Sequence, residues 1–66
     1  MILFKERLKE LRTGKGLSQA QLAEILHVSQ RSISSWETEF RQPDYETLEA
    51  ISKYFDVTTD YLLGLD

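Results

Sequence analysis

The stretch from Gln19 to Thr38 constrains the fold of this chain more than any other feature, because it holds two short helical patterns separated by a tight turn. Each pattern carries apolar residues at helical spacing. These residues are Leu22, Ala23 and Leu26 in the first pattern and Ile33 and Trp36 in the second. The turn, His27-Val28-Ser29, is so short that the two helices must cross, and Ala23 is small enough for a close approach. The pattern predicts a helix-turn-helix.

The second helix of this pair presents a polar outer face with almost no charge. Its polar positions are Gln30, Arg31, Ser32, Ser34 and Ser35. Such side chains donate and accept hydrogen bonds, as the edges of DNA bases do. Because a helix-turn-helix commonly places its second helix in the major groove, this face indicates a surface for DNA.

Length and composition limit the chain to one small domain, residues 1 to 66, in which 41% of the residues are hydrophobic. A single core is only just sufficient at this size. There is no cysteine, which excludes disulfides and thiolate metal sites. The first twelve residues mix charged with apolar side chains, so they predict neither a signal peptide nor a membrane span. We therefore expect a cytoplasmic protein.

The net charge of −3 argues at first against nucleic acid, because phosphate contacts need lysine and arginine. The charges are unevenly distributed, however. Residues 1 to 31 carry six basic and three acidic side chains, a net charge of +3, whereas residues 32 to 66 carry two basic and eight acidic ones, a net charge of −6. A basic half that faces a DNA backbone and an acidic half that faces away would reconcile DNA binding with the negative net charge. The alternative is ordinary solvated surface charge.

The periodicity predicts an all-α fold of five helices with no strand. The first helix is expected from about Ile2 to Arg12, with a stop at Gly14 and Gly16. The second begins at Ser18, which forms a capping box with Gln21.

The remaining three helices also have marked ends. Ser29 caps the third, Asp44 the fourth, and Thr58 a short last helix that Gly64 ends. The apolar residues expected to face the core are Phe4, Leu8 and Leu11 in the first helix and Leu48, Ile51 and Phe55 in the fourth, with Tyr45 and Tyr54 at its margins.

Several coordinated segments make the chain similar to the lambda-repressor-like, Cro-type helix-turn-helix family. The segments are LKELR, LSQAQLAEILHVS, ISSWE, the proline-led fourth helix and DVTTDYLLG, and they span nearly the whole chain. The resemblance implies a compact five-helix DNA-binding domain whose third helix is the recognition helix. It also implies that Arg12 pairs with Glu37 to tie the first helix to the third.

The same resemblance implies base contacts by Gln30, Arg31 and Ser35. Their chemistry suits this role, since glutamine can bond adenine N6 and N7 together and arginine can bond guanine O6 and N7 together. The side chain of Ser35 is short and discriminates only weakly between bases. Each of these side chains could instead simply face solvent.

The phosphate contacts implied by the resemblance are Gln19 and Ser29. Gln19 would lie in the first turn of its helix, where free backbone amides and the positive dipole end favour an anion. Ser32 is a further candidate, as is Arg41, the only basic residue between Thr38 and Gln42. With one basic residue in this loop, we expect little phosphate clamping from it.

Three residues depart from the family pattern. His27 and Glu39 stand where relatives commonly have glycine, and Ser52 stands where relatives often bury alanine. We expect His27 at a positive φ in the turn, because relatives commonly have glycine there and histidine is among the residues enriched at positive φ. A metal site at His27 is not expected, since the chain has no second histidine and no cysteine. The Ser52 hydroxyl can bond back to a helical carbonyl. Trp36 could stack on bases, but its spacing from Ile33 favours the core.

Together these observations predict a sequence-specific transcription regulator, favoured as a repressor, that binds a palindromic double-stranded operator as a homodimer. Apolar side chains crowd the C-terminal end, and those expected in the dimer interface are Tyr61, Leu62 and Leu65. The alternative is that Leu62 and Leu63 complete the core while Tyr61 and Leu65 stay exposed singly.

The sequence holds no arrangement of nucleophile, base and pocket, so we expect no enzyme, no cofactor, no metal and no small-molecule substrate. A bacterial or phage-encoded protein, associated with the nucleoid when bound, fits these expectations, and no membrane partner is expected. Two other functions remain open: a protein-interaction module that keeps the fold without DNA affinity, and an antitoxin that binds both DNA and a toxin.

Overall fold

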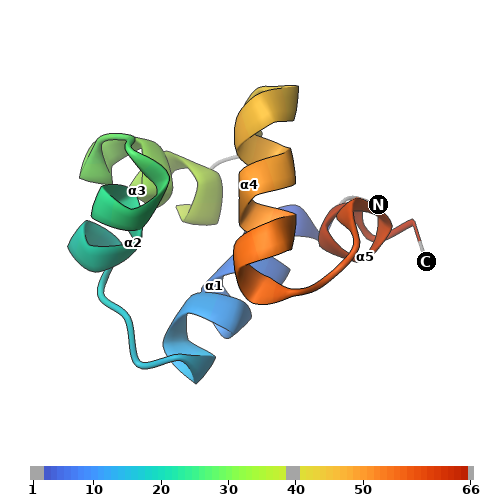
Figure 1. The fold of residues 1–66 in the computed structure, drawn as a ribbon, viewed down its shortest axis with the longest axis horizontal. Helices are drawn as coiled ribbons and strands as arrows, with labels where there is room; N and C mark the ends of the chain where they lie inside the picture. Colours follow the sequence, from blue (N-terminus) through green and yellow to red (C-terminus); the bar gives the residue numbers. More distant parts are fainter. Residues whose placement is uncertain (1–2, 39–40, 66) are drawn as a thin grey trace.

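The computed structural model describes residues 3–38 and 41–65, and within these ranges it contains five helices and no strand (Figure 1). The helices are α1 (Phe4–Gly14), α2 (Gln19–Leu26), α3 (Gln30–Thr38), α4 (Tyr45–Phe55) and α5 (Thr59–Leu63). The predicted all-α, five-helix fold is confirmed. The predicted start at Ile2 and the residue Glu39 lie outside the described ranges.

The first helix ends at Gly14, two residues beyond the predicted Arg12. The chain then reverses through Gly16, whose φ of +69° is a left-handed conformation that glycine adopts without strain. The amide of Leu17 returns to the carbonyl of Arg12 at 3.1 Å and closes this turn.

The four predicted N-caps are all present, which is why helices α2 to α5 begin where the sequence indicated. The capping oxygens of Ser18, Ser29, Asp44 and Thr58 each accept a hydrogen bond from the amide three residues later, at 2.9 to 3.1 Å. The Gln21 side chain also accepts from the Ser18 amide at 2.8 Å, which completes the predicted capping box.

The turn between α2 and α3 depends on His27. Its φ of 58° is left-handed, as predicted for this residue, and it lets the Val28 amide reach the carbonyl of Ala23 at 3.0 Å. Val28 is half-buried against the core, and Ala23 is buried where the two helices meet. The crossed pair predicted from the apolar spacing is therefore formed.

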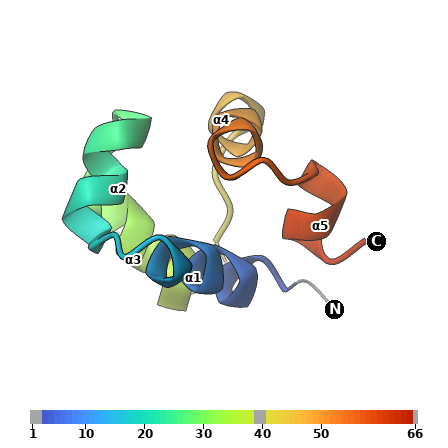
Figure 2. The same ribbon diagram turned by 60° about the horizontal axis from the view of Figure 1, so that its bottom comes forward.

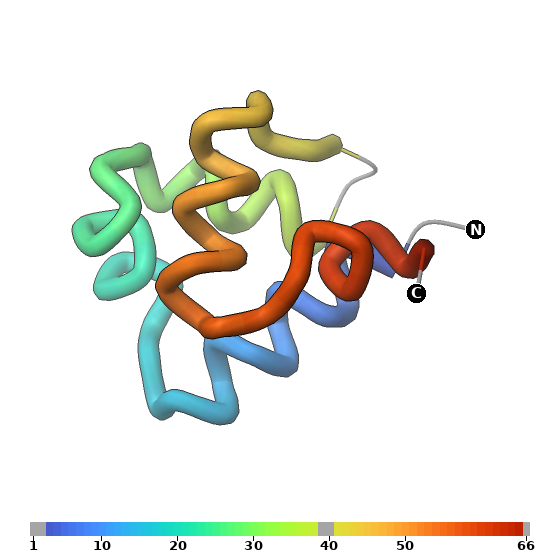
Figure 3. Tube along the Cα trace, turned by 45° about the vertical axis from the view of Figure 1, so that its right-hand side comes forward, coloured from blue at the N-terminus to red at the C-terminus, as the bar shows by residue number. Residues whose placement is uncertain are grey.

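The helices surround one apolar core. Figure 2 shows the α2–α3 pair and α5 on opposite sides of α1 and α4. Helix α3 packs on both α1 and α2, and α5 packs on both α1 and α4. In Figure 3 the chain leaving α4 returns as α5 beside the start of α1. The fully buried side chains are Phe4, Leu8, Leu22, Ile33, Ile51 and Leu62.

The core includes one residue that was predicted to lie at the surface. The prediction that Leu62 lies in a dimer interface is wrong, because its side chain is 0% exposed and fills the core under α5. Leu48, Ile51 and Phe55 of α4 are buried as predicted, and Tyr45, expected at the margin of this helix, is 91% exposed. In α1, Leu11 is only half-buried. Ser52 is buried, and its hydroxyl donates to the carbonyl of Glu49 at 2.9 Å, as predicted.

Candidate nucleic-acid interface

The first turn of α3 presents its polar side chains to solvent. Gln30 and Arg31 are exposed, and Ser35, one turn later, is partly exposed. Ile33 and Trp36 are buried on the opposite stripe of the same helix, so packing fixes which face of α3 points outward. The three residues predicted to contact bases thus share an accessible part of the helix.

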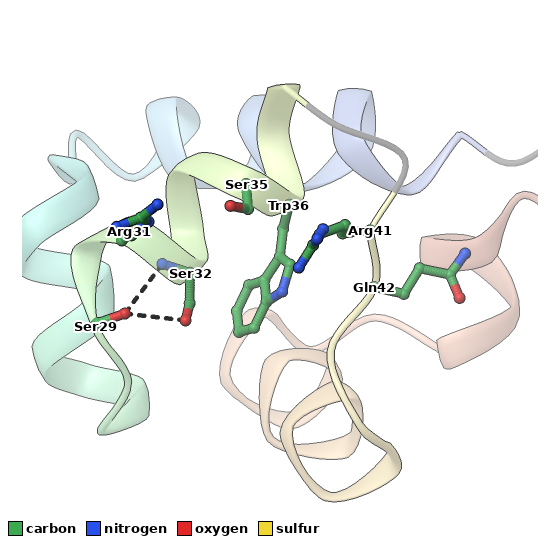
Figure 4. Close-up of a pocket in the computed structure, with 7 residues that line it drawn as sticks. All are labelled: Ser29, Arg31, Ser32, Ser35, Trp36, Arg41 and Gln42. Atoms are coloured by element: carbon green, nitrogen blue, oxygen red, sulfur yellow. Dashed lines mark hydrogen bonds between the residues drawn. The ribbon is translucent and has the colours of Figure 1, made fainter.

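Ser29 and Ser32 form a hydrogen-bonded pair at the start of α3. The Ser29 hydroxyl accepts from the Ser32 amide at 3.1 Å and lies 3.0 Å from the Ser32 hydroxyl (Figure 4). Whichever hydroxyl donates to the other, one hydroxyl proton of the pair remains for an outside acceptor. These two predicted phosphate contacts are thus brought together.

A polar pocket of about 250 Å³ adjoins this pair and lies between α3 and the chain that follows it. Its lining residues are Ser29, Arg31, Ser32, Ser35, Trp36, Arg41 and Gln42 (Figure 4). Five of these are predicted DNA contacts, so the fold unites residues from α3 and from the loop before α4. Gln42 and Trp36 also line this pocket, and neither was predicted to do so; the spacing of Trp36 from Ile33 favoured a place in the core.

A charged network behind α3 holds three helices together. Arg12 donates from Nε and Nη2 to the two carboxylate oxygens of Glu37 at 2.6 and 3.0 Å, which confirms the predicted pair. The two side chains are 11% and 2% exposed. The bidentate hydrogen bond to Glu37 raises the pKa of Arg12 above its ordinary value. The remaining Nη1 of Arg12 donates to the carbonyl of Leu17 at 2.7 Å.

Gln19 has a partner that the sequence did not reveal. Its amide nitrogen donates to the Glu37 carboxylate at 3.1 Å, so Glu37 accepts from both α1 and α2. This contact joins residues 18 positions apart, and no local pattern could have indicated it. It holds the side chain of Gln19, in the first turn of α2, beside α3.

Other basic residues of the N-terminal half also make contacts within the molecule. Arg7 donates to the carbonyl of Tyr61 and lies 4.1 Å from the centroid of its ring, which ties α1 to α5. The Lys15 ammonium lies 4.7 Å from the ring centroid of Tyr54. Part of the positive charge that the sequence analysis assigned to a DNA-facing half therefore serves helix packing.

Residues 3–38 and 41–65 contain no group of three or more histidine, aspartate or glutamate side chains placed to hold a metal ion. None of their helices is long and apolar enough to cross a membrane.

Known proteins resemble this chain in sequence and in structure. A family model described as helix-turn-helix matches residues 8–62. The HTH-type transcriptional activator BcrR of Enterococcus faecalis is 55% identical over 61 residues, and the HTH-type transcriptional regulator ImmR of Bacillus subtilis is 43% identical over 61. These alignments cover 92% of this chain but only 30% of BcrR and 48% of ImmR, so the chain spans half or less of the length of either relative.

A solved structure extends the comparison to three dimensions. It is the crystal structure of the P22 c2 repressor protein in complex with a synthetic operator. Its protein chain is 36% identical to this one and superposes with a TM-score of 0.89, with all of both chains covered.

Proposed function

The chain belongs to the helix-turn-helix family, and we propose that it binds double-stranded DNA sequence-specifically as the DNA-binding domain of a transcription regulator. The observation that carries this proposal is the accessible start of α3, where Gln30 and Arg31 stand next to a pocket lined with hydroxyls and guanidinium groups. The similarity to a repressor bound to its operator, over the full length of both chains, supports it.

Base reading is assigned to Gln30, Arg31 and Ser35. The N-terminal part of a recognition helix enters the major groove most deeply, and Gln30 and Arg31 occupy that part of α3. Arg31 has the two parallel donors that guanine O6 and N7 accept, while the Gln30 amide matches adenine N6 and N7. The hydroxyl of Ser35 adds a weaker contact.

Phosphate binding is assigned to Gln19, to the Ser29–Ser32 pair and to Arg41. The Gln19 amide nitrogen carries two protons, and Glu37 accepts only one of them. The second proton can bind a phosphate oxygen while Glu37 holds the amide in place. Such contacts set the register of α3 on the duplex without reading its sequence.

We propose that two copies bind the two halves of a palindromic operator, because one short helix reads too few bases to find a single site. The proposed contact between copies is the end of α5, where Leu65 is 69% exposed and Tyr61 is partly exposed. Leu62 is excluded from this contact because it is buried in the core.

The residues of this surface do not determine whether the regulator activates or represses transcription. Repression, the mode favoured from the sequence, needs only that the bound domain block a promoter. The relatives include a named activator and a named repressor, so repression stays a prediction.

Selection of bound duplexes from a random DNA pool tests the proposal. We expect enrichment of a palindrome whose half-sites are about 10 base pairs apart. A binding-deficient variant, Gln30→Ala combined with Arg31→Ala, serves as the control and should enrich no motif. Failure of the wild-type protein to enrich any sequence would overturn the proposed function.

A further inference from the structure

The ring of Trp36 is buried, but one edge of it reaches the surface. It is only 9% exposed and packs in the core with Ile33, yet it lines the polar pocket beside α3. Figure 4 shows the ring between Ser32 and Arg41, with its nitrogen on the edge nearer Arg41.

The indole nitrogen has no acceptor among residues 3–38 and 41–65. Indole Nε1–H can only donate, and when buried it usually finds a partner. Every side-chain nitrogen and oxygen that is sealed from solvent in the described residues does have a partner. The Trp36 nitrogen is therefore not sealed, and its proton is available to something that enters the pocket.

The rest of the pocket lining indicates what would enter. The guanidinium groups of Arg31 and Arg41, the amide of Gln42 and the one hydroxyl proton left by the Ser29–Ser32 pair line the same space, and among residues 3–38 and 41–65 no carboxylate lines it. A cluster of hydrogen-bond donors suits an anion with several oxygens.

We propose that the Nε1–H of Trp36 donates a hydrogen bond to a phosphate oxygen of the DNA backbone, so that one side chain both fills the core and contacts DNA. The inference rests on the proposed DNA-binding function and names a further contact residue for it. It also explains how the recognition helix is fixed: the ring that anchors α3 in the core is itself held by the phosphate.

A neutral donor has a recognisable effect on binding. A hydrogen bond to a phosphate contributes to affinity for every duplex, but loss of an uncharged donor does not change the number of counterions released. Trp36→Phe keeps an aromatic ring in the core and removes the N–H together with part of the volume of the indole. We expect it to bind the selected operator and a random duplex about tenfold more weakly, with an unchanged dependence on salt.

The control at the same pocket is Arg41→Gln, which removes a charged donor. It should lower the slope of log K against log salt by about 0.9 if Arg41 neutralises one phosphate. Wild-type affinity of a folded Trp36→Phe variant for both duplexes would overturn the inference about Trp36 and leave the proposed function intact. A loss confined to the selected operator would also overturn it, since that would mark a base contact.

The wild-type protein supplies a second readout that does not depend on a variant. Trp36 is the only tryptophan, so the chain has a single indole N–H resonance. We expect this resonance to shift downfield when the protein is titrated with duplex DNA. A stationary indole resonance, with shifting α3 amides, would contradict the indole contact alone. If neither moves, the protein does not bind DNA and the proposed function fails as well.

Discussion

At the scale of single residues, Arg31 is the sharpest test of base reading. It is exposed in the first turn of α3, and an arginine bonded twice to guanine discriminates against other bases. We predict that Arg31→Ala costs about 1 to 3 kcal/mol on the selected operator and relaxes one base position. Binding titrations on operators substituted at each position measure this. Lys53→Ala, an exposed cation on α4, is the control, and equal losses on operator and random duplex would reduce Arg31 to a phosphate contact.

Glu37 is the residue on which the orientation of α3 depends most. Its carboxylate is 2% exposed and accepts from both Arg12 and Gln19, so its removal leaves a mostly buried guanidinium without a counter-charge. We predict that Glu37→Ala lowers the free energy of unfolding by roughly 3 to 5 kcal/mol. Denaturant unfolding measures the loss.

The matched control for that loss removes both charges. Arg12→Met combined with Glu37→Leu should recover most of the stability, because no buried charge is then left unpaired. A double variant that is no more stable than Glu37→Ala would show that packing, and not the ion pair, explains the effect.

At the scale of helices, the boundaries were predictable because they are local. A cap needs one side chain and the amide three residues on, so Ser18, Ser29, Asp44 and Thr58 could be identified from the sequence alone. The positive φ of His27 was predictable because relatives commonly have glycine at this position and histidine is among the residues enriched at positive φ.

Contacts between helices were less accessible to sequence reasoning. The Arg12–Glu37 pair was predicted from the family resemblance. The hydrogen bond from Gln19 to Glu37, in contrast, depends on the relative orientation of α2 and α3. The burial of Leu62 depends on the angle at which α5 meets α1 and α4, which five residues of helix do not specify. The pocket arises only when the loop carrying Arg41 and Gln42 returns past α3.

The cap of α4 makes a prediction about acid. The Thr47 amide donates to the Asp44 carboxylate and lowers the pKa of Asp44 below its ordinary value. A pKa lower in the folded than in the unfolded state stabilises the fold above the ordinary aspartate range, and this stabilisation is lost as the pH falls through the folded value.

Asp44→Asn isolates this contribution, because asparagine caps a helix about as well but carries no titrating proton. We expect the variant to lose less thermal stability than the wild-type protein between neutral pH and the acid range below the ordinary pKa of aspartate. Melting temperatures measured across that interval test it. Parallel curves for the two proteins would mean that Asp44 does not contribute to acid sensitivity.

At the scale of the whole molecule, the distribution of charge sets how binding responds to salt. Arg7, Arg12 and Lys15 are engaged with other helices, so few cations remain for phosphates near α3. We predict a salt dependence equivalent to roughly three to five phosphates per monomer. Binding titrations between low and physiological salt measure the slope of log K against log salt. A slope that corresponds to ten or more released ions per monomer would contradict this distribution of charge.

Assembly on DNA belongs to the same scale. If α5 forms the contact between two copies, Tyr61→Glu combined with Leu65→Glu should abolish cooperative binding to the full operator and leave half-site affinity unchanged. Lys53→Glu, at an exposed position on α4, changes the net charge by the same −2 and controls for altered surface charge. Undiminished cooperativity in the α5 variant would eliminate this interface.

The most direct test of sequence-specific binding through α3 is a comparison of affinities for the selected operator and a scrambled duplex at physiological salt. The account predicts that the wild-type protein prefers the operator by at least about 10³-fold. It also predicts that Gln30→Ala with Arg31→Ala removes most of this preference while the protein stays folded. Equal wild-type affinity for both duplexes, or an undiminished preference in the double variant, would contradict the account.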